Sequence, residues 1–209
     1  MHEEILNTLA LLRKYIYQRE WGLMQSLTRD LLGQLPTFDA LEVVIEALQD
    51  YLPIFERHHP QGTVKGQMPR ELMITVLSFG FAPEQLPDYI TGEYDTPGSG
   101  QFANAVLEMC RAMQKDRDPA QRADLFASAI ANVILAELSE LYYTAHPDDY
   151  ARVRANHIDP MTGDYTDPDA AKIPWKLWAD PLVEARDVTL WLRIADALEN
   201  KHNAQAAGA

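Results

Sequence analysis

The chain has 209 residues, of which 47% are hydrophobic and 23% are charged, and its formal net charge is −13. This composition can bury a core, so it excludes a chain that is disordered by composition. The acidic field repels phosphate backbones and argues against double-stranded nucleic acid as a ligand, whereas a protein partner of basic character suits it.

The N-terminal stretch and the cysteine content bear on the cellular compartment. The chain begins acidic and lacks a basic segment ahead of an apolar one, so no secretory signal is expected. No run of about 18 apolar residues is present, which argues against a membrane span. Cys110, the single cysteine, cannot form an intramolecular disulfide or a multi-thiolate zinc site. We therefore expect a cytoplasmic protein.

Helical periodicity recurs through the first half of the chain. The third helical stretch has the most regular apolar stripe, with Thr37 or Asp39 available as an N-cap. Pro53 lies inside this stretch and is expected to kink or end the helix there. The stretches with this period are 5–16, 20–35, 37–55, 68–79 and 102–113.

Two further helices are expected in the second half. The segment 119–143 begins with Asp118 as an N-cap and Pro119 in the first turn. Its body is apolar on most of its circumference, which is typical of a helix surrounded by other helices. We therefore place it at the centre of the fold. The last helix is predicted from about 181 to 202, capped by Asp180, with residues 203–209 as a frayed tail.

The absence of β alternation predicts an all-α fold. We expect one domain over residues 1–202, a bundle or irregular array of about five to seven helices. Residues 144–180 depart from the helical pattern, because they are rich in Asp and Pro and contain two tryptophans. Long irregular segments inside a compact domain are often functional, so this insertion is the first candidate for a surface that faces a partner.

The insertion supplies the candidate partner-binding residues: Trp175, Trp178, Asp164, Asp167 and Asp169. Tryptophans three residues apart on a helix make good interface anchors. The alternative is that they close the core over the end of the last helix.

The same aspartates, together with Asp159, also suggest a calcium loop around Gly163. Their spacing does not match an EF-hand, and turn formation is the alternative role for them.

Two Glu-x-x-His pairs suggest a metal centre. Glu56 and His59, and likewise Glu199 and His202, lie three residues apart and share a helix face. In these four residues the chain resembles the ferritin-like di-iron bundles, in which two further helices each add a glutamate. Glu20 and either Glu108 or Glu137 could supply those ligands. The alternative is that both pairs are ordinary polar helix ends.

Arg152 and His157 resemble the R-x4–6-H pair of the HEPN ribonucleases, which implies an RNA-cleaving site at a dimer cleft. The acidic surface opposes the approach of RNA. This interpretation ranks below the metal centre.

The leading functional hypothesis is a non-enzymatic helical interaction module: an adaptor, assembly factor, regulator or small subunit of a complex. The chain lacks the P-loop, the dinucleotide-binding and the serine-hydrolase glycine motifs, so no cofactor is expected. Cys110 lies on an apolar stripe, which predicts a buried and unreactive thiol. The di-metal bundle remains the alternative, from a different class of protein.

Overall fold

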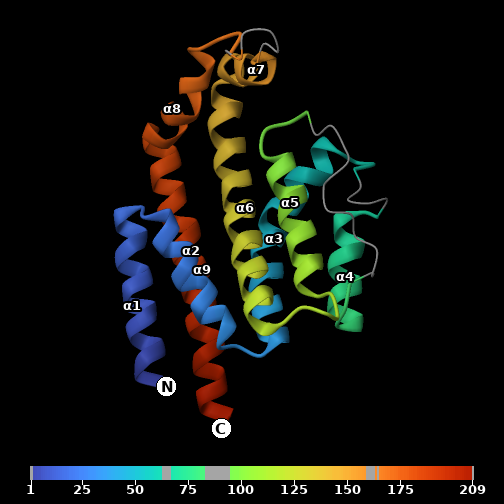
Figure 1. Ribbon diagram of the computed structural model, residues 1–209, viewed down its shortest axis with the longest axis vertical. Coiled ribbons are helices and arrows are strands. Elements are labelled where there is room, and N and C mark those ends of the chain that lie inside the picture. The colour runs from blue at the N-terminus through green and yellow to red at the C-terminus, as the bar shows by residue number, and fades with distance from the viewer. Residues whose placement is uncertain (1, 63–66, 83–94, 159–162, 164, 209) are drawn as a thin grey trace.

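The computed structural model describes residues 2–62, 67–82, 95–158, 163 and 165–208, and within these ranges the chain is helical (Figure 1). The described helices are α1 (His2–Gln18), α2 (Trp21–Gly33), α3 (Thr37–His58), α4 (Pro69–Phe79), α5 (Ser99–Ala112), α6 (Pro119–Ala145), α7 (Pro147–Ala155), α8 (Ile173–Ala179) and α9 (Pro181–Gly208), with a 3₁₀ turn at Ala170–Lys172. Within the same ranges, β structure occurs only as single-residue bridges, such as the one between Ile158 and Tyr165. The all-α prediction is confirmed.

Each of the seven predicted helical stretches is a helix, and the described residues contain two further α-helices. These two, α7 and α8, lie within the segment 144–180 that was expected to be irregular. Pro147 and Pro174 lie in the first turns of α7 and α8. The backbone N–H groups of a first turn have no partner within the helix, so a proline there removes no helical hydrogen bond. Two of the prolines that suggested irregularity are therefore helix-starting residues.

The central position of α6 is confirmed. It packs against α2, α3, α5 and α9, and Figure 1 shows it running through the middle of the molecule. The side chain of Asp118 accepts a hydrogen bond from the backbone N–H of Gln121 at 2.8 Å, as expected of the N-cap. Residues along most of its length are buried, including Phe126, Ile130 and Leu138. Cys110 on neighbouring α5 is also fully buried, which raises the pKa of its thiol to about 12.

By length and composition alone, α6 could also cross a membrane. Within its most apolar stretch, 56% of the residues are buried inside the molecule. The core helix of a soluble protein passes the same test, so this property is weak evidence for a membrane. The absence of a membrane span stays a prediction.

Three details differ from the expected helix ends. α3 continues through Pro53 to His58, so the proline does not end it. Pro36, rather than Thr37 or Asp39, is the N-cap residue of α3, and the Thr37 hydroxyl instead accepts a hydrogen bond from Arg122 of α6 at 3.0 Å. α9 continues to Gly208, so the expected frayed tail is helical up to that residue.

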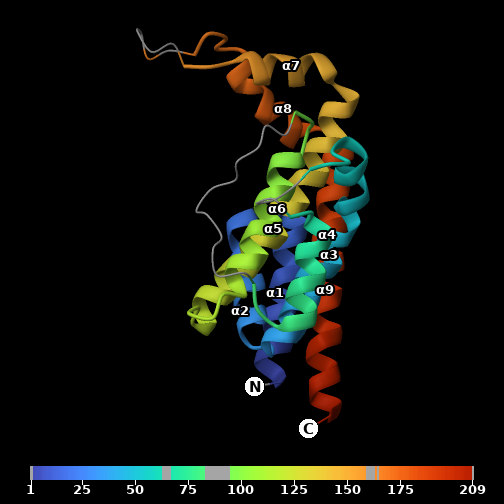
Figure 2. The same ribbon diagram turned by 90° about the vertical axis from the view of Figure 1, so that its right-hand side faces the viewer.

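The C-terminal part of α9 is attached to α3. The side-chain amide of Gln205 donates to Asp39 at 2.9 Å, and Lys201 pairs with Glu42. Figure 2 shows α9 extending past the other helices at the end that carries both termini, while α7 lies across the opposite end. Tertiary contacts of this kind extend a helix beyond the point where local sequence preference ends it.

Candidate interaction surfaces

The two tryptophans of α8 lie in different environments. Trp175 is 75% exposed. Trp178 is half-buried, and its ring centre lies 5.2 Å from that of Trp21 on α2 in an edge-on arrangement. Trp21 in turn packs edge-on against the fully buried Trp191 of α9. The core role left open for this pair therefore applies to Trp178, and the surface role applies to Trp175.

Arg19 fixes α8 against the turn between α1 and α2. Its guanidinium donates to the backbone carbonyl of Trp178 at 3.0 Å and to the carboxylate of Asp187 at 3.4 Å. The Trp21 indole N–H donates to the same carboxylate at 3.2 Å. Burial raises the pKa of Asp187, against the lowering effect of these two donors. The backbone of Arg19 has a φ of 56°, which is a strained conformation for a residue other than glycine. The contacts of its side chain compensate for this strain.

Asp167 and Asp169, the candidate aspartates that the structure describes, both have structural partners. Asp167 accepts three hydrogen bonds from Arg152, at 2.8, 3.0 and 3.1 Å, and further bonds from the backbone N–H groups of Asp169 and Ala170. The Arg152 hydrogen bonds lower the pKa of Asp167. Asp169 pairs with Lys172. This arrangement is the turn chemistry that was the alternative to a calcium loop.

Asp164 and Asp159, the other two aspartates of these predictions, lie outside the described residues.

The proposed Arg152–His157 pair is not assembled as a catalytic site. The Nε atom and one terminal nitrogen of the Arg152 guanidinium both donate to the Asp167 carboxylate. The His157 ring nitrogen Nδ1 lies 3.1 Å from the backbone carbonyl of Ala155, on the exposed surface. Arg152 therefore holds the loop to α7 and does not point with His157 at a common ligand.

The two Glu-x-x-His pairs do not converge. Glu56 forms a two-point ion pair with Arg70 of α4 at 2.7 and 2.8 Å, which lowers the pKa of Glu56. Glu199 pairs with Arg13 of α1 at 2.7 Å, and His202 lies 3.2 Å from the backbone carbonyl of Leu31 on α2. In the part of the chain that the structure describes, no three His, Cys, Asp or Glu residues are placed to hold a metal ion. Each member of the pairs instead connects two helices.

His59 lies beside two hydroxyl groups in a geometry that resembles a nucleophile and its base. Its Nε2 atom is 2.9 Å from Thr96 Oγ1 and 3.0 Å from Ser99 Oγ, and burial lowers the pKa of the imidazole. Ser99, however, is fully buried at the start of α5. The three side chains join the end of α3 to the start of α5, and we assign them a structural role.

A narrow cleft of about 100 Å³ lies between α3, α6 and α9. Three of its four charged lining residues are paired: Asp50 with Arg193 at 2.7 Å, and Glu137 with Arg186 at 2.5 Å. Pockets for drug-sized ligands measure about 300–1,000 Å³. The cleft is thus too small for such a ligand, and we treat its ion pairs as links between helices.

A group of exposed apolar side chains gathers at α4, a helix that the sequence analysis did not single out. We call them the phenylalanine surface, which consists of Phe38, Ile74, Leu77, Phe79 and Phe81, with exposed fractions between 38% and 66%. The opposite side of α4 is buried against α3 and α5 through Leu72, Met73 and Val76. This short helix therefore has one buried apolar face, and its exposed side carries Ile74 and Leu77 among polar residues such as Arg70, Glu71 and Ser78.

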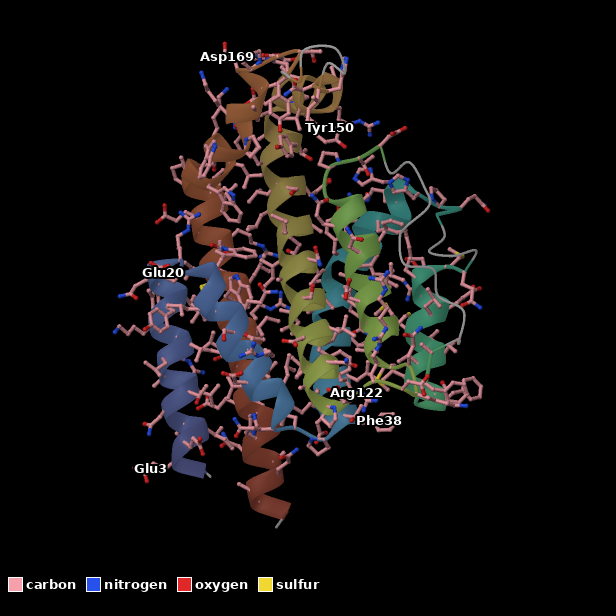
Figure 3. The ribbon with its side chains drawn as sticks, viewed as in Figure 1. Glu3, Glu20, Phe38, Arg122, Tyr150 and Asp169 are labelled. Atoms are coloured by element: carbon pink, nitrogen blue, oxygen red, sulfur yellow. The ribbon has the colours of Figure 1, made fainter. Side chains whose placement is uncertain are left out.

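Gly80 shapes this surface. It ends α4 in the left-handed conformation, with a φ of 70°, and the turn places the rings of Phe79 and Phe81 6.2 Å apart. A Cβ atom at Gly80 would lie 2.9 Å from the Phe38 ring, so the turn rests directly on Phe38. Figure 3 shows Phe38 beside Arg122, whose guanidinium donates to the neighbouring Thr37 hydroxyl at 3.0 Å. Three segments distant in sequence thereby form one surface.

The sequence contains a partial signal for this surface. The stretch 72–81 has apolar residues at successive positions on more than one helix face, which is unusual for a short helix. Periodicity alone does not tell which of these faces the core covers.

No protein-family model, no curated protein and no solved structure matches this chain.

Proposed function

We propose that the chain is a non-enzymatic protein-interaction module whose partner docks on the phenylalanine surface. The observation that carries this proposal is the group of exposed apolar side chains at α4, an eleven-residue helix whose other side is packed in the core. Contiguous exposed apolar groups on a soluble protein mark interaction sites or aggregation-prone regions. Aromatic side chains are enriched among the residues that dominate binding free energies.

A second contact at Trp175 accords with the same function. Trp175 is the more exposed of the two tryptophans on α8, and it lies apart from the tryptophan cluster that Trp178 joins. Asp167 and Asp169 would shape this second surface through their ion pairs rather than contact the partner directly. The net charge of −13 favours a partner that is basic overall.

The proposal is tested by removing the apolar character of the phenylalanine surface. We expect Phe79→Ser with Phe81→Ser to weaken the affinity for the partner by about thirtyfold or more, because two central aromatic contacts are lost. Partners that co-purify with the tagged chain would be identified by mass spectrometry and their affinities measured by calorimetry. Far-ultraviolet circular dichroism would confirm that the variant is folded, as expected for exposed positions.

The matched control is Leu6→Ser with Leu11→Ser on α1. These leucines are 41% and 43% exposed, comparable with Phe81, but they lie on a different helix. The control variant should keep the partner. A phenylalanine variant that retains every partner at unchanged affinity would overturn the proposed function.

A further inference from the structure

Helices α3 and α9 are joined by a regular series of polar contacts. The two helices lie side by side (Figure 2), and they are antiparallel, because later residues of α9 contact earlier residues of α3. The donors on α9 fall on one i, i+4 row of that helix. The contacts are Arg193 with Asp50 at 2.7 Å, Lys201 with Glu42, and Gln205 with Asp39 at 2.9 Å.

One position in this series has no donor. Ala197 lies midway between Arg193 and Lys201 on α9, and Glu46 lies midway between Asp50 and Glu42 on α3. Alanine has no polar side chain, and among the described residues Glu46 has neither a hydrogen bond nor an ion pair. The hydrogen bond with Glu42 is the main cause that raises the pKa of Lys201, and the charge of Glu46 adds a weaker effect. Glu46 is therefore the carboxylate of the series that lacks a donor.

The cleft between α3, α6 and α9 opens at this position. Glu46 and Ala197 both line it. Most of its other walls are apolar and buried, formed by Val43, Ala47, Val133, Ile134, Leu190 and Ile194. Because the alanine side chain ends at Cβ, it leaves space where a longer residue on α9 would reach across to α3.

The size of the cleft suits a single extended side chain. Its volume is about 100 Å³, and for comparison a protein cavity of about 150 Å³ can hold a benzene molecule. A stem of a few methylene groups therefore fits into a cleft that is too small for a drug-sized ligand.

The charge of the cleft favours a cation as the end group of that side chain. Of the three carboxylates that line it, Asp50 is paired with Arg193 and Glu137 with Arg186. Glu46 is left with an uncompensated negative charge, and it is exposed to solvent. Lysine combines a flexible four-carbon stem with a compact ammonium group, and it can bury the stem while the ammonium stays near water.

We infer that the cleft between α3, α6 and α9 receives a lysine side chain of a partner protein, with its stem against the apolar walls and its ammonium at the Glu46 carboxylate. This lysine occupies the place in the α3–α9 series where Ala197 offers no donor. The net charge of −13 favours the approach of a basic partner. The cleft shares no lining residue with the phenylalanine surface, so the inference goes beyond the proposed function.

The test compares two small probes by heteronuclear NMR titration of the full chain. One is lysine with both termini blocked, N-acetyl-lysine N-methylamide, and the other is the equally blocked norleucine, which has an alkyl stem without an ammonium. We expect blocked lysine to cause saturable shifts of the Ala47 and Ala197 amide signals in the millimolar range. It should bind at least about threefold tighter than blocked norleucine, because an exposed ion pair adds a modest free energy.

Three variants locate the binding. Glu46→Gln, at an exposed position, should remove the preference for lysine and leave the norleucine affinity unchanged. Ala197→Leu fills the cleft, and Ala197→Lys supplies the missing cation from α9 itself, so each should abolish the shifts. Glu3→Gln, at an exposed carboxylate on α1, is the matched control and should keep the wild-type affinities. Far-ultraviolet circular dichroism checks the folding of the Ala197 variants, and the Glu46→Gln result does not depend on them.

The inference is overturned if blocked lysine and blocked norleucine bind equally, if the lysine preference survives Glu46→Gln, or if no saturable shift appears up to about 100 mM. Binding of n-butylammonium without binding of blocked lysine would also overturn it, because the occupant would then be a small amine. A homodimer in sedimentation equilibrium that Glu46→Gln disrupts would identify a second copy as the occupant instead. The phenylalanine variants test a different surface, so either proposal can fail while the other stands.

Discussion

At the scale of single residues, a glycine determines how the start of α5 sits on α6. Gly98 has a φ of 77°, and a Cβ atom there would overlap the carbonyl oxygen of Ala136 and lie 2.6 Å from the Tyr51 hydroxyl. The same hydroxyl donates to the carbonyl of Pro97 at 2.7 Å. The position thus requires both a left-handed backbone and the absence of a side chain.

We predict that Gly98→Ala lowers the free energy of unfolding by about 2 kcal/mol or more, since it adds backbone strain and a steric overlap. Gly100→Ala is the matched control two residues away, with open space around the new Cβ atom and a helical backbone. It should raise stability by about 0.5 kcal/mol. Urea denaturation of both variants checks the pair. Equal effects of the two changes would contradict the placement of the loop 95–98 on α6.

At the scale of secondary-structure elements, α8 shows how a seven-residue helix can hold an exposed side chain in place. Ile173 and Leu177 form its buried face, and Trp178 reaches the tryptophan cluster at the edge of that face. Trp175 points away from this contact and remains exposed. Ile173, Leu177 and Trp178 therefore anchor α8, and Trp175 is exposed to solvent.

We predict opposite outcomes for the two tryptophans of α8. Trp178→Ala should lower the free energy of unfolding by about 2 kcal/mol, because it removes the ring contact with Trp21. Trp175→Ala should change it by less than about 0.5 kcal/mol, as for other exposed positions. Chemical denaturation followed by circular dichroism measures both. A large loss of stability in Trp175→Ala would show that its side chain belongs to the core.

At the scale of the whole molecule, buried ionisable groups affect stability in two opposite ways. Burial lowers the pKa of His202 and His59 below 6.5, so the unfolded chain binds more protons than the folded one as the pH falls through about 6.5. Stability from these groups is present above that pH and is lost below it. Burial raises the pKa of Asp187 and Glu137, so their contribution falls as the pH rises from about 4.

We predict that His202→Gln reduces the loss of stability between pH 7 and pH 5. Glutamine can still donate to the Leu31 carbonyl, as the His202 ring does, but it does not bind a proton. One titrating group changes the slope by at most about 1.4 kcal/mol per pH unit. Urea denaturation at several pH values measures the slope, with His157→Gln, at an exposed position, as the control. An unchanged slope in His202→Gln would contradict the burial of this ring.

Sequence periodicity and capping residues determined the helices of this protein, because both act within a few turns of chain. The apolar circumference of 119–143 was sufficient to place α6 at the centre. Helix ends such as that of α9 were less predictable, because the contacts of Lys201 and Gln205 with α3 come from a part of the chain far away in sequence.

The assignment of side chains to core or surface was decided only by the tertiary structure. Trp175 and Trp178 are alike in sequence, but only Trp178 meets Trp21 and Arg19. The Glu-x-x-His pairs match a metal-binding pattern, but Arg70 and Arg13 of other helices take up their glutamates. α4 has apolar residues on more than one side, and which of them stay exposed depends on where α3 and α5 pack. Local sequence specifies the pattern on each helix, whereas exposure depends on neighbours brought together from distant parts of the chain.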